Sequence, residues 1–203
     1  MSAHPINIVV ADDLARSRLT VFFRYLLVLP PGLWLYLWSI PAGIVLVINW
    51  FATLLMGQSP AWAHNFLSSY LRYSIHVSAY GNLMANPWPG FSSKRSYPVT
   101  VEIAPPEQQR RLITFFRILL AIPASIIAYI LQIPLGIVVI VGWFVALILG
   151  RWPASFERIT AYCLQYNTRT NAYTFLLTQR YPRLGSAKNI DPLENGDIEG
   201  NPV

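Results

Sequence analysis

The chain has 203 residues, of which 54% are hydrophobic and only 12% are charged. A soluble domain carries roughly 25% charged residues, so this composition excludes an ordinary water-soluble protein and favours a membrane protein. The net charge of +6 suits either nucleic acid or an anionic membrane surface. Because the basic residues flank long apolar runs, we expect a lipid bilayer as partner and no nucleic acid.

The sequence contains a tandem duplication. When it is shifted by 93 residues it aligns with itself without a gap, and the identical pairs include Pro41 with Pro134, Trp50 with Trp143, Gly57 with Gly150 and Tyr80 with Tyr173. Apolar composition alone would not align prolines, glycines and tryptophans in one register. We therefore expect two copies of one unit, over residues 1–93 and 94–183.

Each unit begins with a short segment in which apolar residues alternate with other residues. The alternating apolar positions are Ile6, Ile8 and Val10 in the first unit, and Val99, Val101 and Ile103 in the second. A period of two predicts a short strand in each unit. Because isolated strand edges are disfavoured, we expect the two strands to pair with each other.

An uncharged apolar run of 33 residues follows in each unit, at 25–57 and 118–150. About 20 helical residues cross a hydrocarbon core, so each run is too long for one ordinary crossing. Pro41 and Pro134 lie in the middle of the runs, and proline suits the first turn of a helix better than its interior. The pattern predicts a transmembrane helical hairpin in each unit, at about 20–57 and 113–150. The expected fold is thus a mainly α membrane protein with four transmembrane helices.

The basic residues predict the orientation of these hairpins. All 15 lysines and arginines lie outside the two runs. By the positive-inside rule, we expect a multi-pass membrane protein with both termini in the cytoplasm. The two units then share one orientation, with a pseudo-twofold axis along the membrane normal. Hairpins that dip into one leaflet and return have the same charge distribution, and this alternative stays open.

The segments after the hairpins, at about 61–83 and 154–178, have aromatic residues spaced by three or four positions. This spacing predicts amphipathic helices, either in the cytoplasmic headgroup layer or packed against the hairpins as core. The aromatic residues expected at the interface are Trp62, Tyr70, Tyr73, Tyr80, Tyr166 and Tyr173. Residues 184–203 lose the pattern, and their acidic composition predicts a disordered tail.

The second unit carries several motifs of one known family. They are the segment 97–103, Phe115-Phe116-Arg117, Trp143-Phe144, Asn171-Ala172-Tyr173 and Arg180-Tyr181-Pro182. With them, residues 97–184 resemble the bacterial domain of unknown function 4389 family, and residues 5–91 match as a weaker second copy. The first copy departs from the pattern at residues 86–89. The resemblance implies a bacterial inner-membrane protein and no assigned activity.

The chain shows no pattern of residues that indicates catalysis. We expect no metal and no cofactor, because no two histidines have the spacing of metal ligands and no glycine-rich phosphate loop is present. His4, His64 and His76 are expected at the surface or interface, and Cys163 as a packed thiol. The apolar runs contain no Asp, Glu or Lys, which argues against a proton relay. We therefore expect a protein that is not an enzyme.

Two groups of residues are candidate contact sites. The arginines at the start of each run, Arg18 and Arg24 with their counterparts Arg111 and Arg117, form pairs that suit a lipid phosphate. The alternative for Arg24 and Arg117 is that they extend toward the surface, or pair with Glu102 or Glu107. Asn49, in the middle of an apolar run, is expected to bond to a neighbouring helix or to contact a ligand.

The leading functional hypothesis is a non-enzymatic accessory or scaffold subunit of a larger bacterial membrane complex. The seven tryptophans and eleven tyrosines exceed what the helices need for their own interior, so we expect a membrane protein partner or a homo-oligomer. One alternative is binding or transport of a lipid or small solute at the pseudo-twofold repeat interface. The other is a wedge that generates membrane curvature.

Overall fold

The computed structural model describes residues 6–10, 17–91 and 97–184, so the predicted tail from residue 185 onward lies outside the described residues. The protein is mainly helical and repeats one order of elements twice. The first copy comprises β1 (Ile6–Val10), α1 (Arg18–Phe22), α2 (Arg24–Met56) and α3 (Ala61–Gly81). The second comprises β2 (Val99–Ile103), α4 (Arg111–Phe115), α5 (Arg117–Leu149) and α6 (Ala154–Thr174).

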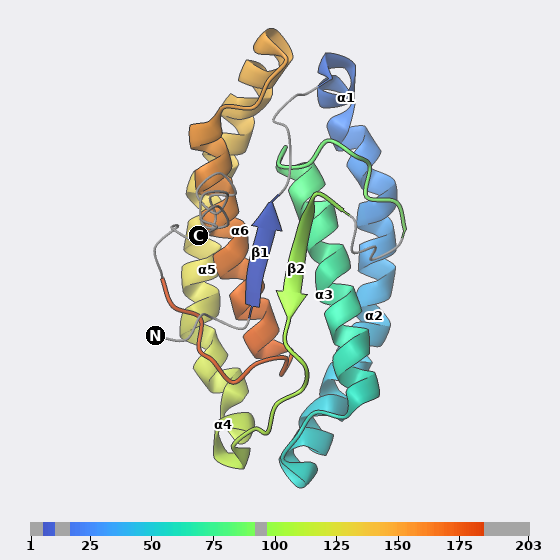
Figure 1. Ribbon diagram of the computed structural model, residues 1–203, viewed down its shortest axis with the longest axis vertical. Coiled ribbons are helices and arrows are strands. Elements are labelled where there is room, and N and C mark those ends of the chain that lie inside the picture. Colours follow the sequence, from blue (N-terminus) through green and yellow to red (C-terminus); the bar gives the residue numbers. More distant parts are fainter. Residues whose placement is uncertain (1–5, 11–16, 92–96, 185–203) are drawn as a thin grey trace, which may run out of the picture.

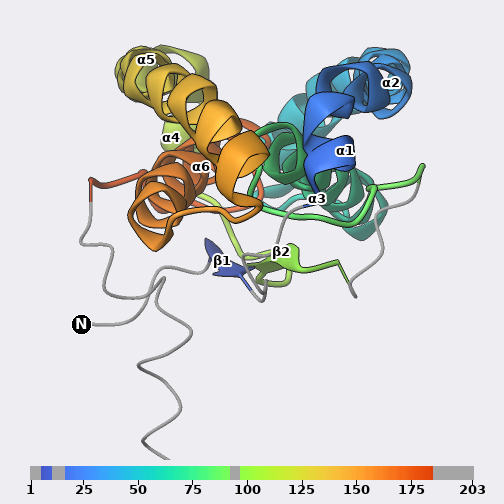
Figure 2. The ribbon, with the colours of Figure 1, turned by 90° about the horizontal axis from the view of Figure 1, so that it is seen from above.

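The elements form three layers. The two strands make one outer layer, α3 and α6 make the middle layer, and the long helices α2 and α5 make the other outer layer (Figure 2). The helices α2 and α5 run in opposite directions, and α1 and α4 lie at opposite ends of the molecule (Figure 1). The pseudo-twofold axis between the copies therefore stands perpendicular to the layers.

The strands β1 and β2 pair antiparallel, with Ile8 opposite Val101 and Val10 opposite Val99. The apolar side chains of Ile6, Ile8, Val99 and Val101 are all buried. Alternate residues of a strand point to the same face, so the period-two pattern directs these side chains onto the helices of the middle layer.

The two copies are intertwined. Strand β1 of the first copy packs on α6 of the second, and β2 packs on α3 of the first. The short helices are exchanged in the same way, because α1 packs on α5 and α4 packs on α2. The indole N–H of Trp50 donates to the carbonyl of Thr114, and that of Trp143 donates to the carbonyl of Val21, both at 2.9 Å. Neither copy closes its core alone.

The predicted hairpins are wrong. Each apolar run forms one continuous helix of 33 residues, with Pro30, Pro31 and Pro41 inside α2, and Pro123 and Pro134 inside α5. A proline removes one backbone N–H, whereas a hairpin turn leaves several N–H and C=O groups without partners in an apolar setting. The continuous helix is therefore the less costly structure. It ends where the sequence supplies a left-handed residue, at Gly57 (φ 77°) and Gly150 (φ 70°).

Equivalent positions of the two copies are filled in different ways. In the first copy Asn49 is buried, and its side-chain oxygen accepts a hydrogen bond from Ser59 at 2.7 Å. In the second copy the equivalent residues are Gly142 and Trp152, and a Cβ atom on the glycine would clash with the indole ring. A polar pair in one copy thus occupies the space that a glycine and a tryptophan occupy in the other.

Candidate functional site: an apolar face with a groove

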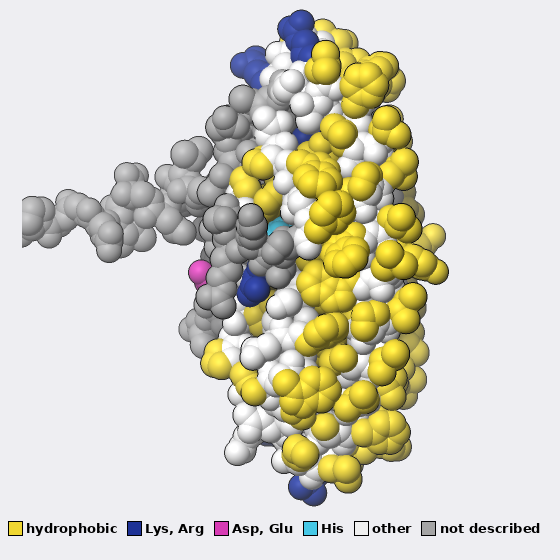
Figure 3. Space-filling model, turned by 90° about the vertical axis from the view of Figure 1, so that its right-hand side faces the viewer, with side chains coloured by type: hydrophobic (Ala, Val, Ile, Leu, Met, Phe, Trp, Pro, Cys, Tyr) yellow, Lys and Arg dark blue, Asp and Glu magenta, His cyan; other side chains and the backbone are white. Residues whose placement is uncertain are grey.

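The outer sides of α2 and α5 form a large exposed apolar face. Both helices are long and apolar enough to cross a membrane, yet only 17% and 22% of their most apolar windows are buried. A core helix of a soluble protein would be mostly buried. On the α2 side, apolar side chains cover this face along its whole length (Figure 3). Its members include Leu26, Leu33, Ile40, Ile44 and Leu55 on α2, and their equivalents Leu119, Ile126, Ile133, Ile137 and Ile148 on α5.

The structure does not bring the four predicted phosphate-binding arginines together. Arg18 and Arg111 are exposed, at the starts of α1 and α4, which lie at opposite ends of the molecule (Figure 1). Arg111 donates a hydrogen bond to the carbonyl of Leu55 at 3.1 Å, which fixes α4 against the end of α2. Arg24 and Arg117 are each only 1% exposed, so they neither extend toward the surface nor reach a lipid phosphate.

Arg24 and Arg117 instead hold the ends of α3 and α6. The guanidinium of Arg24 lies 4.5 Å from the centre of the Tyr80 ring and donates to the carbonyl of Ala85 at 3.0 Å. Arg117 lies 4.5 Å from the centre of the Tyr173 ring and donates to the carbonyls of Tyr173 (2.9 Å) and Thr178 (3.1 Å). The carbonyl end of a helix carries partial negative charge, so it attracts a cation.

The predicted pairing of Arg117 with Glu107 is replaced by an indirect arrangement. A carboxylate oxygen of Glu107 accepts hydrogen bonds from the backbone N–H of Gln179 at 2.7 Å and from the hydroxyl of Thr178 at 3.3 Å. Glu107 thereby holds the segment whose carbonyl accepts the hydrogen bond from Arg117. Glu102 lies in β2, opposite Asn7, and is exposed.

Most of the predicted interfacial aromatics are core residues. Trp62 is 55% exposed, but Tyr73, Tyr80, Tyr166 and Tyr173 are at most 3% exposed. The reason is that α3 and α6 form the middle layer, so their aromatic sides pack against α2 and α5. Tyr70 is partly buried and lies in an aromatic cluster with Trp38 and Phe175.

The histidines that the structure describes are also buried, which corrects the expectation of surface positions. A ring nitrogen of His64 lies 3.1 Å from the carbonyl of Ala104. His76 stacks on Tyr97 with ring centres 4.4 Å apart. Burial, and secondarily the charge of Arg72, lower the pKa of His76 to about 4, so its ring is neutral at neutral pH. His4 lies outside the described residues.

Asn49 and Cys163 also lie in the interior. The amide N–H of Asn49 donates to the carbonyl of Phe175 at 3.4 Å and so connects the two copies. Cys163 is 3% exposed, and burial raises the pKa of its thiol, so the unreactive protonated form is favoured. Among residues 6–10, 17–91 and 97–184, no three His, Cys, Asp or Glu side chains lie close enough to hold a metal ion.

The two long helices border a groove, which is marked by a cavity lined by residues of both helices. Helix α2 packs on α3 and α5 packs on α6, so α2 and α5 stand apart from each other (Figure 2). One cavity of about 290 Å³ bridges the copies near the start of α5. It is lined mainly by apolar side chains of both copies, namely Leu46, Val47, Trp50 and Phe51 of α2 with Ile118 and Leu176.

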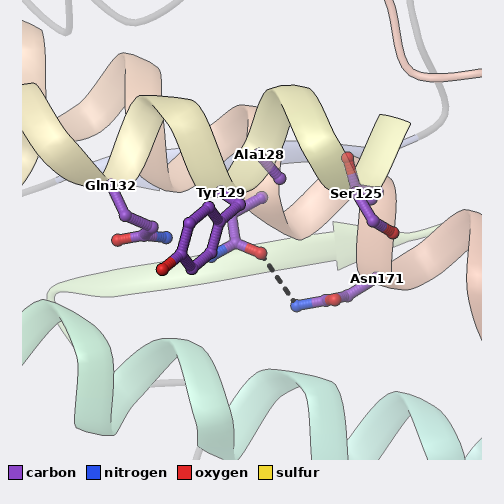
Figure 4. Close-up of a pocket in the computed structure, with 7 residues that line it drawn as sticks. Ser125, Ala128, Tyr129, Gln132 and Asn171 are labelled. Carbon is purple, nitrogen blue, oxygen red and sulfur yellow. Dashed lines mark hydrogen bonds between the residues drawn. The ribbon is translucent and has the colours of Figure 1, made fainter. Parts of the chain in front are cut away.

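A second cavity, of about 220 Å³, has a polar lining (Figure 4). Ser125, Tyr129 and Gln132 line it from α5, and Asn167 and Asn171 from α6, where the amide of Asn171 donates to the side-chain oxygen of Asn167 at 3.2 Å. Positions 118, 125, 129 and 132 lie on one side of a helix with 3.6 residues per turn. Ile118 lines the inter-copy cavity, so the polar cavity faces the same groove.

Sequence reasoning missed this polar cavity. Its signal was a set of hydrogen-bonding side chains spaced by four and three residues (125, 129 and 132) inside an apolar run, opposite two asparagines spaced by four. No single one of these polar residues indicates a site, since single polar residues are common in membrane helices. Only the packing of α5 on α6 brings the two sets together.

The comparison with protein families matches the chain twice. The model described as "Domain of unknown function (DUF4389)" matches residues 18–92 and 111–184, so the chain belongs to this family and carries it in duplicate. The two matched segments are offset by 93 residues, as the internal alignment of the sequence predicts. No curated protein and no solved structure matches the chain.

The buried arginines generate a prediction on stability. Replacement Arg117→Lys keeps the charge but removes the guanidinium nitrogen that donates to two carbonyls and the planar group beside the Tyr173 ring. Hydrogen bonds from charged groups contribute about 1.5–3 kcal/mol each. We expect the midpoint of thermal unfolding in detergent to fall by roughly 4–8 °C. Arg18→Lys is the control, because Arg18 is exposed, and its midpoint should not change. Equal midpoints for Arg117→Lys and the wild type would contradict the role given to Arg117.

Proposed function

We propose that this protein is a non-enzymatic scaffold that lies within one leaflet of a bacterial membrane, with α2 and α5 parallel to the membrane plane. The observation that carries the proposal is the single apolar face formed by both helices on the side opposite the sheet. Exposed apolar patches on soluble monomers rarely exceed a few hundred Å², and larger ones mark membrane or protein interaction sites. A hydrocarbon layer is the solvent that suits such a face.

The length of the helices favours the in-plane orientation over a spanning one. A helix of 33 residues is about 50 Å long, whereas the hydrocarbon core is about 30 Å thick. A spanning helix of that length has to tilt strongly or leave apolar turns in water. A helix that lies along the membrane surface is not limited by this thickness.

The position of the sheet gives a second, independent argument. The strands lie near the middle of the long axis, beside the central parts of α3 and α6 (Figure 1). If α2 and α5 crossed the bilayer, the sheet would lie at its midplane. Among the described residues, each strand pairs on one edge only. Open sheet edges exposed to lipid are not tolerated in the hydrocarbon region. The in-plane orientation places the sheet in water.

The arginines support the same orientation. Arg18 and Arg111 are equivalent residues at opposite ends of the molecule. A multi-pass arrangement places them on opposite sides of the membrane, against the positive-inside bias. In the plane, both lie at the rim of the apolar face, where they attract anionic headgroups. The pseudo-twofold axis then runs along the membrane normal, and both copies meet the leaflet in the same way.

The scaffold role rests on what the water-facing side offers. An open strand edge pairs readily with an added strand of a partner, and its main-chain hydrogen bonds supply affinity. The sheet of two short strands has such an edge on each side within the described residues. We therefore expect a membrane protein partner, or a second copy of the chain, to bind at this side.

A second candidate function follows from the same face. Two long helices inserted into one leaflet increase the area of that leaflet alone, which bends the membrane. The protein then acts as a curvature wedge, and tubulation of vesicles at high loading is the observation that favours this function over scaffolding. Transport is less favoured, because in the proposed orientation no helix crosses the bilayer.

The depth of the long helices is the first prediction of the proposal. In a Cys163→Ala background, single cysteines at Leu26, Ile40 and Leu55 carry a spin label, and their depth is measured by collisions with oxygen and a nickel chelate. These residues are 62%, 57% and 73% exposed. We expect the three depths to be equal within one leaflet.

A label at Glu102 is the control and should report water. The equivalent positions Leu119, Ile133 and Ile148 on α5 should repeat the profile of α2. A profile that is shallow at the two ends and deepest at the centre would show a spanning helix and would refute the in-plane proposal.

The scaffold role gives the second prediction. Purification of the native protein in mild detergent, followed by mass spectrometry of intact complexes, should yield a stoichiometric partner protein or a dimer. The physical reason is that strand pairing and an apolar interface survive mild detergent better than single polar contacts. If the protein is inserted in native membranes but is recovered only as a stable monomer, the scaffold role is excluded. The curvature wedge is then the remaining candidate function.

A further inference from the structure

We infer that the groove between α2 and α5 binds one glycerolipid molecule, with its uncharged glycerol ester region in the polar cavity and one acyl chain in the apolar cavity beside Arg117. The inference rests on the proposed membrane insertion and deepens it by naming a bound ligand class. It is carried by two neighbouring cavities that face the same groove, one lined by hydroxyl and amide side chains and the other almost entirely apolar.

The polar cavity needs a partner with hydrogen-bonding groups. The side chains of Ser125, Tyr129 and Gln132 make no hydrogen bond within the described part of the chain, although they belong to a helix whose exposed side is otherwise apolar. In hydrocarbon, a polar group without a partner costs free energy, and water is scarce there. A ligand that supplies donors and acceptors at this place removes that cost.

The chemistry of the lining selects an uncharged ligand group. The cavity contains hydroxyls and amides, with Asn167 and Asn171 at its α6 side, and no charged side chain lines it. The amide N–H and hydroxyl O–H groups of such side chains can donate hydrogen bonds to the ester carbonyls of a lipid. The amide oxygens can accept a hydrogen bond from a glycerol hydroxyl. A phosphate would require the arginines, but Arg117 is engaged by the carbonyls of Tyr173 and Thr178.

The apolar cavity lies at the distance that one amphiphilic molecule needs. Ile118 in the apolar cavity and Ser125 in the polar cavity are seven residues apart on α5, which is about 10 Å along the helix. A glycerol backbone in one cavity therefore allows its acyl chain to enter the other. The face on which the groove opens is the one that meets the leaflet, so a lipid enters without leaving the membrane.

The two copies differ in a way that predicts one lipid and not two. Ala128 and Thr170 line the polar cavity of the second copy, and the equivalent residues of the first copy are the larger Leu35 and the apolar Val77. The second copy also has the larger polar groups, with Gln132 where the first has Ser39, and Asn171 where it has Ser78.

The test uses a diacylglycerol with a photoreactive diazirine on one acyl chain. The full chain is reconstituted in phosphatidylcholine vesicles with this probe, irradiated, and the cross-linked peptides are mapped by mass spectrometry. We expect cross-links concentrated in the segment that contains Trp50 and Phe51, with about one probe per chain. A phosphatidylcholine with the same chain is the second probe. Equal labelling by both assigns recognition to the shared ester region, and preference for diacylglycerol assigns it to the free hydroxyl.

The variant Gln132→Leu/Asn171→Leu should reduce this labelling about tenfold, because two hydrogen bonds of about 0.7 kcal/mol each correspond to that ratio. Ser39→Ala/Ser78→Ala, at the equivalent positions of the first copy, is the matched control and should label like the wild type. Cross-links spread evenly along the apolar face, or unchanged in the Leu variant, would overturn the inference. Spin-label depth at Ile40, measured in each variant, separates this failure from a failure of membrane insertion.

Discussion

The structure is organised by the need to cover two 33-residue apolar helices on one side only. About 25 cal/mol is gained for each Å² of apolar surface removed from water, and α3 and α6 cover only the inner sides of α2 and α5. The sides of α2 and α5 that remain uncovered face the same direction, away from the sheet. The rest of the molecule, including the sheet, lies behind this face. This exposed face is the observation on which the proposed membrane insertion rests.

The intertwining of the copies is what keeps α2 and α5 on the same side. Each strand and each short helix packs on the other copy, so the long helices cannot separate without opening the shared core. The buried arginines add a polar connection at each end, because Arg24 and Arg117 hold the chain where α3 and α6 finish. Exchange of elements between copies gives a rigid support for a face that no other element packs against within residues 6–10, 17–91 and 97–184.

The sequence allowed the repeat and the family to be predicted, and both are confirmed. The repeat could be predicted because identical prolines, glycines and tryptophans align in one register, and this alignment requires no knowledge of how the helices pack. The predicted hairpins are wrong because Pro41 and Pro134 do not break their helices, since an apolar environment favours an uninterrupted helix. Once each run is one helix, the distribution of arginines no longer predicts two hairpins with both termini on one side.

The candidate site was less accessible to sequence reasoning for the same physical reason. Arg24 appears in the sequence as a basic residue next to an apolar run, and only the fold places Tyr80 and a helix end beside it. The polar cavity needs the register of α5 on α6, which no local pattern contains. Tyr73 and Tyr173 have the spacing of an interfacial helix, but packing of α3 against α2 and of α6 against α5 makes them core residues.

The most direct measurement is the sidedness of the two ends of the molecule. Cysteines replace Arg18 or Arg111 in a Cys163→Ala background, and sealed inverted membrane vesicles are treated with a thiol reagent that does not cross membranes. The in-plane account predicts that both positions react from the same side, because both lie at the rim of one leaflet. Reaction of one position only before detergent is added, and of the other only afterwards, would contradict the account and show that α2 and α5 cross the bilayer.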